Sequence, residues 1–133
     1  MPLEPGSPES WLSYARSDLA LARVDASDDL LRDMLCFHAQ QAVEKCIKAV
    51  LILTGVPFPR VHSIERLTDL LPVSIRRTPE LIGSAGLTAY ATTFRYPGGE
   101  EPTSEEEYQE AVRLAAAVLA WAEEIILAGK DIC

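Results

Sequence analysis

The feature that most constrains the fold is one long helical pattern in the first half of the chain. It follows a capping sequence that begins at Ser27 and continues without a break to Gly55, where glycine and proline stop it. Apolar residues recur at steps of three and four throughout, and Val43, Ile47 and Val50 widen the apolar stripe beyond one face. We therefore expect a helix that is covered on most of its sides and lies at the centre of a helical bundle.

Other segments carry helix start signals followed by the same period. Ser7 and Thr78 each precede a proline at the first helical position, Ser63 caps a short apolar segment, and Ser104 precedes a run of glutamates. No segment alternates polar and apolar residues with period two, so we expect no strands. The predicted fold is all-α, an up-and-down bundle of four long helices plus one short helix. The expected helices cover residues 8–25, 28–55, 63–71, 79–94 and 104–129.

The length and composition indicate one packed unit. A chain of 133 residues has the usual size of one domain, so we expect a single domain over residues 1–133 with its core between about residues 10 and 125. The first residues lack the basic and apolar parts of a signal peptide, and no apolar stretch reaches the roughly 20 residues that span a bilayer. We expect a cytoplasmic protein without a membrane segment.

The charge distribution suggests where a negatively charged partner would bind. A formal net charge of −8 disfavours a broad surface for nucleic acid, so any such contact must be a local patch. The candidate binding residues are basic side chains near the short helix together with one later arginine. For those near the short helix, solvated arginines with no binding role are the alternative interpretation; for the later one, capping of the last carbonyls of its own helix is equally open. They are Arg60, Arg66, Arg76, Arg77 and Arg95.

The histidines and cysteines form no pattern that binds a metal. The chain has two histidines, His38 and His62, and three cysteines without a CxxC pair, and no phosphate-binding glycine motif is present. We expect no metal and no cofactor. His38 lies on the apolar stripe, where either a hydrogen-bonded structural role or a functional role is open.

The polar residues of the long helix form a ribbon beside its apolar stripe. Glu44 and Lys48 have the spacing of a surface ion pair, which explains both without any activity. Lys45 lies nearer the apolar stripe, and we take it as a candidate binding residue.

Four blocks of sequence, taken in order, resemble the landmarks of the HEPN (higher eukaryote and prokaryote nucleotide-binding) family. The most specific is the block with two glutamines followed by Glu-Lys and Lys-Ala in the long helix. The blocks are Trp11-Leu12 with Ala15 to Leu19, Phe37 to Ala49, His62-Ser63-Ile64 and Arg95-Tyr96-Pro97. The resemblance implies a helical bundle that forms a homodimer. Such proteins are often encoded beside a minimal nucleotidyltransferase as a toxin and antitoxin pair. The resemblance also implies binding of a nucleotide or RNA in the dimer groove.

The resemblance also implies ribonuclease chemistry in active members, where four to six residues separate an arginine from a following histidine. Arg95 matches the arginine, and Tyr96 beside it is a further candidate binding residue, but Glu100, Glu101 and Pro102 stand where the histidine is expected. Because glutamate and proline do not replace an imidazole as a proton shuttle at neutral pH, the motif is incomplete.

Three functional hypotheses follow. The leading one is a binding protein that dimerises and partners a minimal nucleotidyltransferase. The alternatives are a metal-independent endoribonuclease toxin that uses Arg95 with His38 or His62, and a small helical protein-interaction module.

Overall fold

The computed structural model describes residues 6–27, 29–92 and 102–132, and every regular element within them is a helix. Arg95 and Tyr96, the candidate residues of the incomplete motif, lie outside the described residues. In chain order the helices are α1 (Pro8–Ala22), α2 (Arg32–Leu53), α3 (Ile64–Asp69), α4 (Pro79–Gly83), the 3₁₀ helix η1 (Ser84–Thr88), α5 (Ala89–Thr92) and α6 (Glu105–Ile132).

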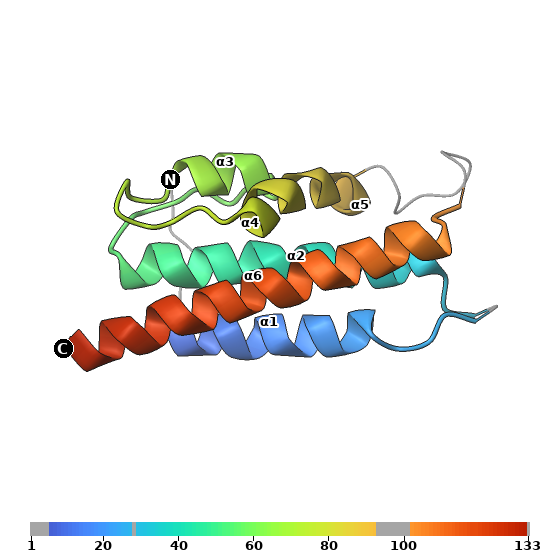
Figure 1. The fold of residues 1–133 in the computed structure, drawn as a ribbon, viewed down its shortest axis with the longest axis horizontal. Coiled ribbons are helices and arrows are strands. Elements are labelled where there is room, and N and C mark those ends of the chain that lie inside the picture. The colour runs from blue at the N-terminus through green and yellow to red at the C-terminus, as the bar shows by residue number, and fades with distance from the viewer. Residues whose placement is uncertain (1–5, 28, 93–101, 133) are drawn as a thin grey trace.

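Helix α2 lies at the centre of the bundle. In Figure 1 it is flanked by α1 on one side and by the α3 to α5 layer on the other, while α6 crosses in front of it. Thirteen of its 22 residues are buried, which matches the wide apolar stripe of the sequence. The predicted all-α up-and-down bundle is confirmed.

Helix α1 begins where the sequence predicts. The Ser7 hydroxyl accepts a hydrogen bond from the Ser10 amide, and Pro8 occupies the first turn. The helix ends at Ala22, earlier than the expected Asp25. The Tyr108 hydroxyl of α6 donates to the carbonyl of Ala22, so the last turn is completed by a neighbouring helix instead of by further turns of α1.

The start of α2 differs from the prediction. Ser27 does not cap the helix; it closes a turn in which its side-chain and backbone oxygens accept from the Leu30 amide. The helix begins at Arg32 without a side-chain cap. Its first turn is instead tied to the residues before α6, because the Asp33 carboxylate accepts hydrogen bonds from the amide and the hydroxyl of Thr103. This contact is distant in sequence, so local capping rules could not have indicated it.

The fourth helical segment is divided. Thr78 caps its start as expected, accepting from the Leu81 amide, but the path changes from α4 to the 3₁₀ helix η1 at Ser84 and returns to α-helix in α5. Two glycines, Gly83 and Gly86, lie at this change, where their weak helix propensity lowers the cost of tightening the turn. The expected end at Phe94 lies outside the described residues.

Helix α6 starts with a capping box. The Ser104 hydroxyl accepts from the Glu107 amide, and the Glu107 carboxylate accepts from the Ser104 amide. No helix in the described part of the chain is long and apolar enough to cross a membrane.

Candidate functional site

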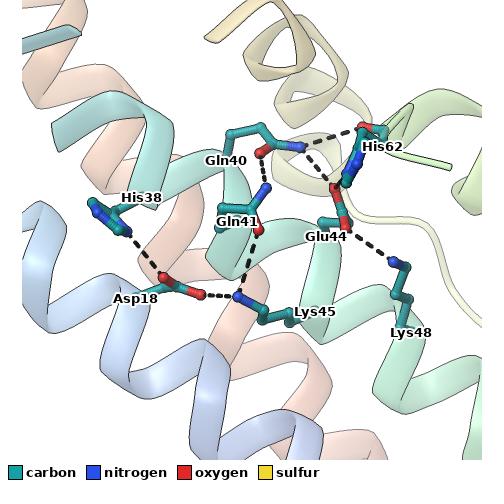
Figure 2. Close-up of polar contacts among 8 residues, drawn as sticks. All are labelled: Asp18, His38, Gln40, Gln41, Glu44, Lys45, Lys48 and His62. Atoms are coloured by element: carbon teal, nitrogen blue, oxygen red, sulfur yellow. Dashed lines mark hydrogen bonds and ion pairs between the residues drawn. The ribbon is translucent and has the colours of Figure 1, made fainter. Parts of the chain in front are cut away.

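A network of hydrogen-bonded polar side chains runs along α2, partly buried in the bundle and partly open to solvent. Figure 2 shows it as two groups, one facing α1 and one facing the segment before α3, joined through neighbouring glutamines. We call them the Asp18 cluster and the Glu44 cluster after the carboxylate at the centre of each. The Asp18 cluster contains Asp18, His38, Gln41 and Lys45; the Glu44 cluster contains Glu44, Gln40, Lys48 and His62.

The Asp18 cluster joins α1 to α2 at a half-open surface. The Nδ1 atom of His38 lies 3.0 Å from one Asp18 oxygen, and Lys45 Nζ lies 2.5 Å from the other. Since a carboxylate only accepts, Nδ1 carries the proton and His38 is oriented by the bond. The His38 side chain is 30% exposed and the Lys45 side chain is 19% exposed. The cluster is therefore held internally yet reachable from solvent.

The Glu44 cluster contains a buried ion pair. Lys48 Nζ lies 2.9 Å from Glu44 Oε2, and the two side chains are only 2% and 4% exposed. The ammonium group also lies 5.5 Å from the Trp11 ring centroid and 5.7 Å from that of Phe58, a geometry that favours a cation over an aromatic face. The sequence-based interpretation of Glu44 and Lys48 as a surface pair was wrong, because the segment after α2 folds back over this face.

The other Glu44 oxygen accepts from two further groups. His62 Nδ1 lies 3.0 Å from Glu44 Oε1, and the Gln40 amide nitrogen lies 3.1 Å from the same atom. The Gln40 amide nitrogen also donates to the His62 backbone carbonyl. Gln40 in turn accepts from Gln41, which links the two clusters at 2.7 Å. A buried carboxylate with this many donors is well satisfied.

The two candidate histidines therefore occupy separate positions. His38 is bound to a carboxylate of α1, whereas His62 lies before α3 and is bound to a carboxylate of α2. The His62 side chain is 66% exposed, so its ring is oriented by a buried group and accessible to solvent. The structure does not bring the two imidazoles into one catalytic pair.

The candidate arginines fall into different environments. Arg77 donates to four backbone carbonyls, those of Thr68, Leu71, Pro72 and Ile75, and thereby satisfies the end of α3 and the turn after it. Its guanidinium is thus engaged in holding the fold.

Three of the other candidate arginines are exposed. Arg60 lies in the link before α3, Arg66 on α3, and Arg76 in the loop before α4. Arg76 lines a hollow of about 520 Å³ between that loop and α6, and its carbonyl accepts from the Trp121 indole. The expected convergence of these arginines with Arg95 remains a prediction, because Arg95 lies outside the described residues.

Cys36 and Cys46 are buried core residues. Burial raises the pKa of the Cys36 thiol to about 11, and burial also raises the pKa of Cys46. Both thiols are protonated at neutral pH and are poor nucleophiles. In the part of the chain that the structure describes, no group of His, Cys, Asp and Glu side chains could hold a metal ion.

Comparison with known proteins gives one matching family and two similar crystal structures. The family profile described as the HEPN domain matches residues 8–125. The crystal structure of TT1696 from Thermus thermophilus is 30% identical, with a TM-score of 0.77 over 89% of this chain and 97% of that one. The crystal structure of ST0689, an archaeal HEPN homologue, is 27% identical, with a TM-score of 0.69 over 90% of this chain and 98% of that one. No curated protein matches the sequence.

Proposed function

Because this chain belongs to the HEPN family, we propose that it is a binding protein: a homodimer that partners a minimal nucleotidyltransferase and accepts a nucleotide or RNA in the dimer groove. The observation that supports binding most is the separation of His38 and His62, each fixed at Nδ1 by its own carboxylate. RNA cleavage by the 2′-hydroxyl needs a base and an acid on either side of one phosphate. Two imidazoles held beside different helices favour a role in binding.

The incomplete motif supports the same proposal. Arg95 stays protonated near neutral pH and is a poor proton acceptor, although it stabilises phosphate charge. Glu100 and Glu101, which stand where a histidine would complete the motif, would repel a phosphate backbone. This combination retains groups for holding an anion and lacks the proton-transfer partner.

The partnership is tested by co-expression. A minimal nucleotidyltransferase encoded beside this chain is produced with it, and a tag on the nucleotidyltransferase is used for purification. We expect the two proteins to elute together in a fixed ratio at physiological salt. An unrelated minimal nucleotidyltransferase serves as the control. Elution of this chain as a free protein in every preparation would contradict the proposal.

The second candidate function is a metal-independent ribonuclease, and one observation favours it. The exposed His62 ring is oriented by buried Glu44, an arrangement that also serves catalytic histidines. Single-stranded and structured RNA is incubated with the protein in chelator, beside Arg95→Ala, His38→Ala and His62→Ala variants. We expect little or no cleavage by the parent protein. Robust cleavage that is lost in Arg95→Ala and in one histidine variant would establish the ribonuclease instead.

A further inference from the structure

Large apolar side chains that are exposed are most frequent in one stretch of the chain. Among the described residues, ten large apolar side chains are exposed, and six of them lie between residues 14 and 34. Single exposed apolar residues need no explanation, whereas exposed apolar residues that share a face mark an interaction site. The six are Tyr14 (68%), Leu21 (48%), Val24 (42%), Leu30 (42%), Leu31 (57%) and Met34 (41%).

Three of these side chains have the helical spacing that places them beside residues of the Asp18 cluster: Tyr14 and Leu21 on α1, and Met34 on α2. Tyr14 and Leu21 are seven residues apart on α1 and so share a face, with Asp18 between them at its edge. The bonds from Asp18 to His38 and Lys45 fix the place where this face meets α2. We call the combined area the α1–α2 surface; it comprises Tyr14, Leu21, Met34, His38, Gln41 and Lys45.

This area is also where α2 is least covered. The residues Met34, His38, Gln41 and Lys45 recur at steps of three and four, and none of them is fully buried, whereas Leu35 and Ala42 beside them are. The remaining sides of α2 pack against α1, α6 and the α3 to α5 layer. The stripe left open on the central helix is thus polar at its middle and bordered by apolar side chains.

The charge of this area suits a second copy of the same chain. Two copies that each carry a net charge of −8 repel one another except where the contacting faces are neutral. On the α1–α2 surface the Asp18 carboxylate is neutralised by Lys45 within the chain. By contrast, α6 opens with Glu105, Glu106 and Glu107.

The order of side chains also fits a two-fold contact. Since α1 and α2 run antiparallel, Leu21 and Met34 lie toward one end of the surface and Tyr14 toward the other, with Gln41 between. A two-fold axis near Gln41 would place each apolar end against the partner's opposite apolar end. It would also bring two Gln41 amides together, and an amide both donates and accepts.

We propose that the α1–α2 surface is the contact between two copies of this chain, so that two Asp18 clusters lie beside the two-fold axis. The proposal rests on the homodimer of the proposed function and adds the surface that forms it. Apolar residues in the contact stabilise it by burial, and an unpaired charge placed there is strongly unfavourable.

The first test is sedimentation equilibrium of the full chain with charge introduced on or off the surface. Tyr14→Glu and Met34→Glu should raise the dimer dissociation constant by about 100-fold or more. Ile82→Glu and Leu127→Glu are matched controls, since those side chains are 61% and 62% exposed outside the surface. We expect the controls to remain dimers. Circular dichroism of every variant shows that the fold is retained.

The second test is crosslinking by oxidation in a Cys133→Ser background. Gln41→Cys should form a disulfide-linked dimer, while Ser74→Cys, exposed in the loop before α4, should not. The native Cys36 and Cys46 thiols are buried and do not interfere.

The outcomes separate the two proposals. A parent dimer that Tyr14→Glu and Met34→Glu leave intact, or that crosslinks through Ser74→Cys and not Gln41→Cys, overturns the proposed surface and leaves the homodimer standing. A parent protein that is monomeric at all micromolar concentrations overturns both.

Discussion

The Asp18 and Glu44 clusters use the same kinds of groups in different surroundings. Each has a carboxylate that binds a lysine and the Nδ1 atom of a histidine. Lys48 is 2% exposed and lies against two aromatic rings, whereas Lys45 is 19% exposed at an open stripe. The same chemistry thus holds the interior together at one place and presents a polar surface at the other.

The two ion pairs differ in burial and not in residue type. Removing one member of a buried pair leaves an uncompensated charge, but the same change near solvent is offset by water. Variants in the two clusters should therefore differ in their effect on stability.

The largest expected effect is on the Glu44 cluster. Glu44→Ala leaves the Lys48 ammonium buried without its carboxylate and should lower the free energy of unfolding by about 3 to 5 kcal/mol. Urea denaturation followed by circular dichroism measures this change. The double variant Glu44→Met with Lys48→Met is the control and should be clearly more stable than Glu44→Ala. A single variant as stable as the parent would show that the pair is not buried in solution.

Alkaline pH tests the burial of the two core thiols, Cys36 and Cys46. The pKa of Cys36 is raised by burial to about 11 in the folded chain, so the unfolded chain loses this proton first as pH rises above about 9. The free energy of unfolding should therefore fall between pH 9 and 11, by about 1 kcal/mol per buried thiol at pH 10. Cys36→Ala should lessen the fall between pH 9 and pH 11; an unchanged slope would contradict the assigned burial.

The Asp18 cluster should matter less for stability. Asp18→Asn removes the charge opposite Lys45 but keeps an oxygen acceptor, and solvent reaches the lysine. We expect a loss of about 1 kcal/mol in the free energy of unfolding. The same urea titration, run beside Glu44→Gln, gives the comparison directly. A loss equal to or greater than that of Glu44→Gln would remove the distinction between the clusters.

The smallest effect is expected for a fully surface ion pair. Arg16 and Glu123 join α1 to α6 at 2.7 Å, with side chains 51% and 39% exposed. Arg16→Gln should change the free energy of unfolding by less than about 0.5 kcal/mol. This is the smallest loss in the free energy of unfolding expected among the three ion pairs. A larger loss would mean that the contribution of a pair to stability does not decrease as its exposure increases.

The sequence was sufficient to predict the helical segments and the helix starts that have local caps, but not the other ends or the division of the fourth segment into α4, η1 and α5. Ser7, Thr78 and Ser104 act as caps because their partners lie three residues away. The end of α1 and the start of α2 depend on contacts of Tyr108 and Thr103, which lie far along the chain. Local patterns carry no information on such contacts.

The hydrogen-bonded side chains of the Asp18 and Glu44 clusters were only partly predictable. His38, His62 and Lys45 stand out in the sequence, but their carboxylate partners do not. Gln40, Glu44 and Lys48 recur at steps of four, which indicates a shared face but not whether that face is covered. The cover comes from Trp11 and Phe58, and only the fold places them there.

The most direct test of the difference between the clusters uses the two histidines of the chain. Their ring signals are followed by ¹H–¹³C NMR over a protein dilution series and assigned with His62→Gln. If the Asp18 cluster lies at the contact between copies and the Glu44 cluster does not, the His38 signals will shift as dimers form and the His62 signals will stay constant. Signals of His62 that move while those of His38 remain fixed would contradict the account.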